Sequence, residues 1–320
     1  MSSRGSRNSR ILDSEHNRRM NLGPDVEYRH RILVVITVTV LYALCFVAIK
    51  AGLELAPPLR FAGLRVLIAG VVLLGVVVIR REPVIPPRRN WPGVLSLAVI
   101  ASAIVYGTMF LSPGRTGAGI AAVLGNAQAL FTVALAALFL GERLTSWKAM
   151  ALTFGLIGVL LVSYPALAGP DAYGVSGAAL ALTASAGSAI GNVIVKRLGP
   201  LSSLLAVTAW SLTLGSLPLL GVSLVAENGE SIVWNLEFIG LVLFLALPGT
   251  ALATVMWYWL IQRSDVGQLA MFLFLVPILG LALAAIIFGE RIGGYEGAGV
   301  LAILAGVGIT AWEMRLPLRL

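Results

Sequence analysis

Charged residues are scarce in this sequence, and their scarcity argues against most kinds of soluble protein. Only 12% of the 320 residues are Asp, Glu, Lys or Arg, whereas 58% are hydrophobic and the mean hydropathy is +0.92. A soluble domain typically carries about 25% charged residues to cover its surface. Soluble hydrolases, nucleic-acid-binding proteins and secreted disulfide scaffolds therefore fit this composition poorly.

Residues that bind metals or form disulfides are equally scarce. The single cysteine, Cys45, lies in an apolar run and cannot form an intramolecular disulfide. Both histidines, His16 and His30, belong to the N-terminal tail, so the apolar part of the chain has no pair at metal-ligand spacing. The chain also lacks a phosphate-binding Gly-Lys-Ser/Thr loop and has no acidic residue in the middle of an apolar run. We therefore expect no metal, no cofactor and no built-in ATP hydrolysis.

Long apolar runs dominate the rest of the chain. They lie between a polar, arginine-rich tail (1–31), expected to be disordered, and a short C-terminal tail (314–320). The ten runs are 32–50, 59–79, 92–112, 117–139, 146–164, 174–196, 201–224, 236–260, 266–288 and 295–313. Because each run is close to one bilayer thickness at helical rise, the sequence predicts an all-α integral membrane protein with ten transmembrane helices.

The distribution of basic residues predicts the orientation of these helices. With the N-terminus inside the cell, 18 of the 23 lysines and arginines fall on the cytoplasmic side and only four fall outside. Lysine and arginine are enriched in cytoplasmic loops. Both termini are therefore expected in the cytoplasm.

The chain also contains an internal repeat. Residues 134–143 read ALAALFLGER and residues 282–291 read ALAAIIFGER, with seven identities in ten at an offset of 148. Each copy spans five predicted helices, and an odd number gives the copies opposite orientations. Inverted repeats are typical of secondary transporters, whose substrate site lies near mid-membrane. We thus predict two inverted five-helix repeats, 32–165 and 173–313.

Three stretches resemble the EamA family of the drug/metabolite transporter superfamily. These are Ala48–Arg65, the helix ends Leu140–Arg143 and Phe288–Arg291, and Phe272–Pro277. The resemblance covers nearly all of residues 32–313. It implies a carrier of the bacterial inner (plasma) membrane, many relatives being exporters of amino acids or other small metabolites. Fold alone does not name the cargo.

Two polar residues near the middle of the fourth apolar run are candidates for substrate binding. Asn126 and Gln128 are two positions apart, so they point to nearly opposite faces of a helix. Polar groups inside a membrane are costly and therefore informative. We expect Asn126 to face a central cavity and Gln128 to brace a neighbouring helix.

The second candidate group contains one cation and several aromatic residues. Arg65 should either form an ion pair with Glu54, which we favour, or bind an anionic substrate. Tyr106, Trp210 and Phe272 are expected to form cavity walls. The segment 257–259 (Trp-Tyr-Trp) lies near a helix end, where an interfacial aromatic belt is the simpler interpretation.

Prolines inside two predicted spans mark candidate hinges. Pro248-Gly249 and Pro277 should each remove a backbone donor and leave the carbonyls of Phe244 and Leu273 unpaired.

Two glutamates occupy equivalent places in the repeat. Glu142 and Glu290 follow helix ends, and we expect both to be structural rather than proton-carrying.

Together these features predict a non-enzymatic carrier that moves a small organic metabolite, amino-acid-like or similar, outward by alternating access. Its partners are a small-molecule substrate and membrane lipid, and not nucleic acid. An intramembrane lipid-modifying enzyme, a passive channel and a membrane scaffold remain as alternatives.

Overall fold

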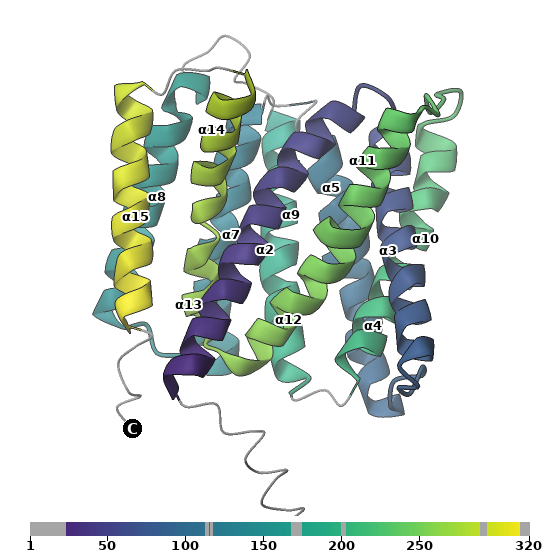
Figure 1. Cartoon of the computed structure of the whole chain (residues 1–320), viewed down its shortest axis with the longest axis horizontal. Coiled ribbons are helices and arrows are strands. Elements are labelled where there is room, and N and C mark those ends of the chain that lie inside the picture. Colours follow the sequence, from purple (N-terminus) through teal and green to yellow (C-terminus); the bar gives the residue numbers. More distant parts are fainter. Residues whose placement is uncertain are drawn as a thin grey trace, which may run out of the picture.

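The computed structural model describes residues 24–112, 115, 118–167, 175–199, 203–288 and 293–313, and every regular element among them is helical (Figure 1). The elements are α2 (Pro24–Gly52), α3 (Pro58–Ile79), η1 (Arg88–Asn90), α4 (Trp91–Ser96), η2 (Leu97–Ile104), α5 (Val105–Leu111), α7 (Ala118–Leu140), α8 (Ser146–Leu167), α9 (Val175–Arg197), α10 (Leu204–Ala226), α11 (Leu236–Ala246), η3 (Leu247–Leu252), α12 (Ala253–Arg263), α13 (Val266–Phe272), α14 (Leu275–Phe288) and α15 (Gly294–Glu313).

Seven helical stretches in the described residues are long and apolar enough to cross a membrane. They are 29–52, 58–79, 88–111, 175–197, 204–226, 236–263 and 294–313. The other three expected spans coincide with shorter apolar helical stretches at 124–140, 146–162 and 266–280. The protein is therefore an all-helical integral membrane protein, and the count of ten spans remains a prediction.

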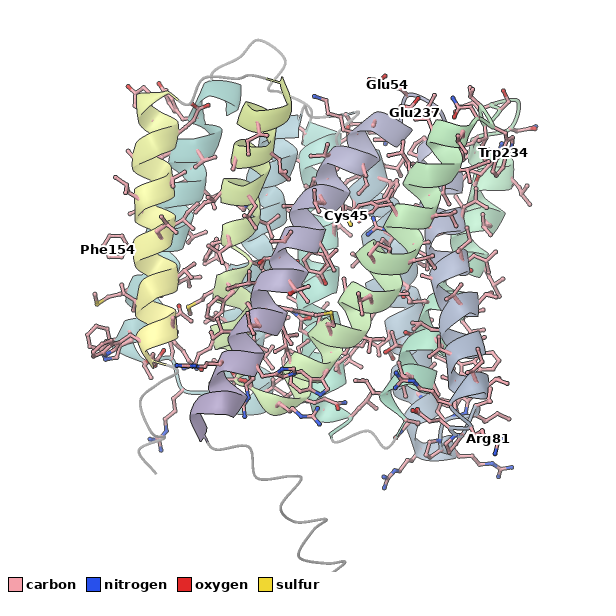
Figure 2. All side chains as sticks on the ribbon, in the orientation of Figure 1. Cys45, Glu54, Arg81, Phe154, Trp234 and Glu237 are labelled. Carbon is pink, nitrogen blue, oxygen red and sulfur yellow. The ribbon has the colours of Figure 1, made fainter. Side chains whose placement is uncertain are left out.

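Basic residues gather at one end of the bundle. Arg80 follows α3, Arg197 ends α9 and Arg263 ends α12. Figure 2 shows Arg81 at this end, whereas Glu54 and Glu237 lie at the opposite end. We call these the basic end and the opposite end.

Buried side chains form the contacts between helices, while the outer surface is apolar. One core cluster is built around Phe61, Phe110 and Phe238, all at most 1% exposed. Large apolar residues also remain exposed on the outside, among them Phe154 and Leu301 (Figure 2 labels Phe154). An exposed apolar surface of this extent suits contact with lipid and not with water.

Helix bounds repeat at the offset of 148 found in the sequence. Shifting α7 by 148 residues gives 266–288, the bounds of α13 and α14 together. The same shift brings the π-helical segment η2 onto η3, so an irregular turn occurs at equivalent places in both halves.

The equivalent helices α8 and α15 pack against each other in antiparallel orientation. The Thr145 hydroxyl, just before α8, donates to Glu313 at the end of α15 (2.6 Å). A Cβ added to Gly158 would lie 2.7 Å from the Gly299 carbonyl, and one added to Gly306 would lie 2.7 Å from the Ala151 carbonyl. The second contact is the first one shifted by 148 residues, and both require glycine because the backbones touch.

Candidate functional site

Arg65 is buried within the bundle among neutral groups. The residue lies in α3 and is only 2% exposed. Its Nε donates to the Thr250 hydroxyl (2.6 Å), and its Nη2 donates to the Gly249 carbonyl (3.2 Å). Nη2 also lies 3.6 Å from the Cys45 sulfur. The third nitrogen, Nη1, has no hydrogen-bond partner among the residues that the structure describes.

The ion pair expected between Arg65 and Glu54 is wrong. All hydrogen bonds of Arg65 go to neutral groups, and Glu54 is exposed at the opposite end of the bundle (Figure 2). Arg65 lies seven residues inside α3, which corresponds to about 10 Å at helical rise. The Glu54 carboxylate therefore stays hydrated at the membrane edge, because it would lose its water if it entered the bundle to reach the guanidinium.

Two aromatic rings cover the guanidinium. Its carbon lies 5.1 Å from the ring centre of Tyr106 and 5.8 Å from that of Phe110. The Phe110 ring is fixed by an edge-on contact with Phe61 (5.3 Å). The structure thus brings together two of the predicted site residues, Arg65 and Tyr106, in cation–π geometry.

The predicted hinge at Pro248-Gly249 forms the π-helical segment η3. The segment presents the Gly249 carbonyl and the Thr250 hydroxyl to Arg65. The Thr250 hydroxyl in turn donates to the Leu245 carbonyl (2.8 Å). The sequence analysis missed Thr250, although a threonine directly after a mid-span Pro-Gly pair was a usable signal.

Pro277 lies in the first turn of α14, directly after a second interruption, where α13 ends and α14 begins. Residues 273 and 274 form a turn between these helices. The expectation of an unpaired Leu273 carbonyl is wrong, because this carbonyl accepts from the Val276 amide (3.0 Å). A tighter i+3 bond therefore replaces the one that proline removes.

The remaining aromatic candidates lie away from Arg65. Phe272 is 3% exposed and packs in a core cluster with Trp257 and Tyr258. Trp210 donates to the Val84 carbonyl (2.8 Å), in the connection after α3 at the basic end.

The aromatic belt expected at 257–259 is wrong for two of its three residues. Trp257 and Tyr258 are 4% and 7% exposed, and the Trp257 indole donates to Asn192 (3.0 Å). The Asn192 amide also contacts the Thr132 hydroxyl (3.4 Å). Asn192 is a polar residue inside a predicted span that the sequence analysis overlooked.

Asn126 and Gln128 are both half-buried in α7. Next to them, the Ser185 hydroxyl of α9 donates to the carbonyls of Leu124 and Gly125 (2.7 and 2.9 Å). Unlike its equivalent α13–α14, α7 continues through this region without a break. The assignment of Asn126 to a cavity and of Gln128 to a neighbouring helix stays a prediction.

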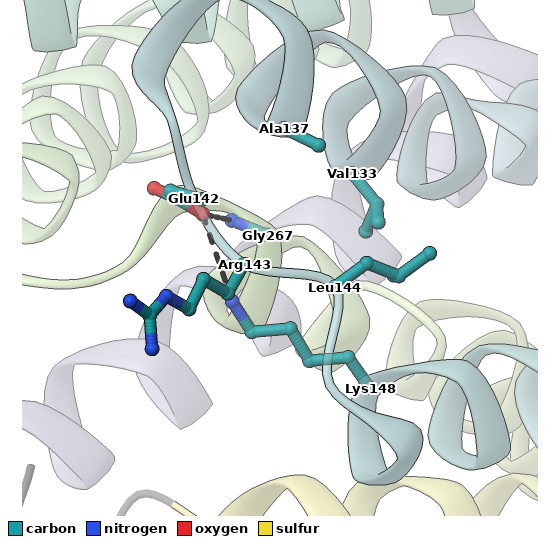
Figure 3. Close-up of a pocket in the computed structure, with 7 residues that line it drawn as sticks. All are labelled: Val133, Ala137, Glu142, Arg143, Leu144, Lys148 and Gly267. Atoms are coloured by element: carbon teal, nitrogen blue, oxygen red, sulfur yellow. Dashed lines mark hydrogen bonds and ion pairs between the residues drawn. The ribbon is translucent and has the colours of Figure 1, made fainter. Parts of the chain in front are cut away.

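Glu142 links the two halves of the chain at the basic end. Its carboxylate accepts from the amides of Val266 (2.8 Å) and Gly267 (3.0 Å) at the start of α13. The Lys148 ammonium lies 3.9 Å from Glu142 and 2.7 Å from Asp265 (Figure 3 shows Glu142, Gly267 and Lys148). Glu142 thus caps the N-terminus of a helix in the other half of the chain, which the sequence analysis did not foresee. Glu290 lies outside the described residues.

The protonation of this cluster follows from its burial. Burial first, and then the neighbouring Asp265 carboxyl, raise the pKa of Glu142 from 4.5 to about 7. Burial also opposes ionisation of Asp265, but its hydrogen bonds with Glu142 and Lys148 outweigh this effect and lower its pKa. Near neutral pH, the half-buried Asp265 and the buried Lys148 therefore form an ion pair beside a carboxyl whose pKa lies in the same pH range.

Comparison with known proteins agrees with the resemblance found in the sequence. The chain is 32% identical to a probable amino-acid metabolite efflux pump of Salmonella typhimurium, over 88% of this chain and 95% of the relative. It is 28% identical to a protein of the same name from Escherichia coli, with the same shares covered. A crystal structure with 19% sequence identity shares the fold, with a TM-score of 0.74 over 90% of this chain and 99% of the other. The model of the EamA-like transporter family matches residues 30–164 and again 175–312. The chain therefore belongs to the EamA-like transporter family.

Proposed function

We propose that this protein is a secondary transporter that moves a small, amino-acid-like organic metabolite out of the cell by alternating access. The observation that carries the proposal is the double match of the transporter family, once in each half of the chain. The names of the Salmonella and Escherichia relatives support an amino-acid-like cargo and outward transport.

In this proposal the chain has ten spans in two inverted repeats, 32–165 and 173–313. The antiparallel packing of α8 and α15 supports the inversion, because equivalent helices in inverted repeats run in opposite directions. We assign the basic end to the cytoplasm of a bacterial inner membrane, in line with the positive-inside rule. Reporter fusions after residue 89 should then report the cytoplasm, and fusions after residue 171 the outside.

We assign the substrate site to two groups of residues. Arg65 and Tyr106 form the first, and the contact between them supports this assignment. The second contains Asn126, Gln128, Phe272 and Trp210. Asn126 hydrogen-bonds the substrate, Gln128 braces the helix, and the aromatic residues form apolar walls.

The transport motion uses the interrupted helices as hinges. Pro248 and Gly249 lie in η3, and Pro277 lies just after the turn between α13 and α14. Irregular backbone is tolerated inside a membrane where other groups satisfy it, and Thr250 does this for Leu245. Such places bend at lower cost than a continuous helix.

Flux measurements in proteoliposomes test the proposal. The purified chain is reconstituted, and uptake or efflux of a labelled panel of amino acids and small metabolites is followed over concentration. A carrier gives saturable flux that an unlabelled competitor suppresses. Flux that rises linearly without competition would indicate a pore, and the absence of protein-dependent flux across a broad panel would contradict transport.

A further inference from the structure

The surroundings of Arg65 contain no negative charge to balance its guanidinium. Its neighbours come from α2 (Cys45), α5 (Tyr106 and Phe110) and η3 (Gly249 and Thr250). Each of these groups is neutral. In the described part of the chain, no acidic side chain lies within 4.0 Å of the Arg65 guanidinium.

The Arg65 guanidinium lacks a counter-charge, and one of its three nitrogens lacks a hydrogen-bond partner among the described residues. Arginine remains protonated in proteins, so the positive charge persists inside the bundle. Neutral partners satisfy Nε and Nη2, whereas Nη1 has none. Unpaired charges are expensive at membrane depth and mark functional sites. An anion that binds here would supply the counter-charge and would accept the hydrogen bond from Nη1.

The equivalent position in the second half shows that packing does not require a charge. Residue 65 shifted by 148 is Thr213 in α10, and α3 and α10 pack directly against each other. The Thr213 hydroxyl donates to the Ala209 carbonyl of its own helix (2.8 Å) and needs no external partner. Of the two equivalent positions, only that of Arg65 carries a cation. One cation is what a single anion-binding site requires.

The shape of the anion follows from the donors and from the rings beside them. A guanidinium presents its N–H groups in a planar fork that matches a carboxylate. The half-buried Tyr106 ring covers the same guanidinium. Aromatic surface next to a carboxylate fork suits an organic acid with an apolar or amphipathic side chain.

We propose that Arg65 binds the carboxylate of the transported metabolite, so that the substrates are small organic acids, amino acids among them. This inference rests on the proposed transport function. In the described conformation Arg65 is closed off from water, so the substrate reaches it only when the bundle opens.

Competition between amino acids and their amides tests the inference on the unmodified protein. Proteoliposomes are loaded with a labelled amino-acid mixture, and its flux is competed with unlabelled amino acids or with the matching amino-acid amides. The amides keep the side chain and the ammonium group but lack the carboxylate charge. The free acids should compete at least tenfold more strongly, because a charge-assisted hydrogen bond is lost with the amides. Equal competition by acids and amides would overturn the proposal.

Variants then assign the preference to Arg65. Arg65→Gln should abolish the difference between acids and amides, and Arg65→Lys should keep part of it because the charge remains without the fork. Arg197→Gln is a matched control, since Arg197 is exposed yet lies at the same 5.1 Å from an aromatic ring, that of Phe139. The control should keep the full preference. An undiminished preference for acids in Arg65→Gln would refute the assignment. If Arg65→Gln does not fold, the preference of Arg65→Lys is compared with that of the unmodified protein, and an equal preference would refute the assignment.

The outcome also separates this inference from the proposed function. Saturable flux of neutral or cationic solutes without any preference for acids would refute carboxylate binding and leave the carrier function intact. Absence of saturable flux for every solute would contradict the carrier function itself.

Discussion

The cluster of Glu142, Lys148 and Asp265 predicts that stability depends on pH near neutrality. The pKa of Glu142 is raised to about 7, whereas the unfolded chain has the ordinary value of 4.5. Between these values the folded protein holds a proton that the unfolded chain has released. The free energy of unfolding should therefore fall as the pH rises from about 5 to about 8.

The size of the effect follows from the same shift. Because the pKa of Glu142 is raised from 4.5 to about 7 on folding, the free energy of unfolding is about 3 kcal/mol lower at high pH than at low pH. The Glu142 side chain is only 13% exposed, so solvent screening reduces this figure modestly. Asp265 does not oppose the trend, because its lowered pKa places its own titration below this range.

Thermal unfolding of the purified protein between pH 5 and pH 8 measures the effect. We expect the midpoint of the unmodified protein to fall by several degrees across this range. Glu142→Gln removes the titrating group and should flatten the profile. Glu237→Gln, which changes an exposed acid in the first turn of α11, should keep the original slope. A flat profile for the unmodified protein, or an unchanged slope in Glu142→Gln, would refute the reasoning.

Three further predictions concern the ion pair, the hinges and the site. Lys148→Met leaves the half-buried Asp265 carboxylate without its partner and should lower the free energy of unfolding by about 1–3 kcal/mol, less than for a fully buried pair, as measured by denaturation in detergent. Pro248→Ala or Pro277→Ala should slow turnover several-fold and change substrate affinity less; transport rates equal to the parent would reduce these prolines to passive kinks. Asn126→Ala should raise the apparent substrate constant about fivefold or more, whereas Gln128→Ala should lower thermal stability and leave affinity nearly unchanged; the reverse pattern would mean that the two helix faces are exchanged.

The helices and the family were predictable because their signal is contained in local sequence. An apolar run of one bilayer thickness forms a helix wherever it lies in a membrane, since every backbone group must be satisfied internally. The tripeptide Gly-Glu-Arg, which occurs at 141–143 and again at 289–291, was an equally local signal of the internal duplication. Pro248 likewise marked the place of the irregular turn η3, whereas the equivalent segment η2 contains no proline and gave no such signal.

Partners of polar side chains were harder to predict because they come from distant parts of the chain. Arg65 and Glu54 are close in sequence, and this proximity suggested an ion pair. The hydrogen-bond partners of Arg65 in fact include Gly249 and Thr250, 184 and 185 residues away. Trp257 likewise has the composition of a belt residue, and only packing against α9 shows that its indole is buried on Asn192.

The two halves of the chain share a scaffold but not its polar groups, and this difference bears on transport. At the basic end, Lys148 joins Asp265, and both lie beside the carboxylate of Glu142. The equivalent positions in the other half are Glu296 in place of Lys148 and Gly117 in place of Asp265, so the same ion pair cannot form there. A carboxylate also joins the two halves at the opposite end, where Glu227 accepts from the amides of Leu59 (2.6 Å) and Arg60 (2.9 Å) at the start of α3. The lysine and aspartate are what the basic end has in addition. In the proposed alternating-access cycle, opening of the basic end would therefore break the Lys148–Asp265 pair as well as the bonds to a carboxylate, and protonation of Glu142 would act at that end.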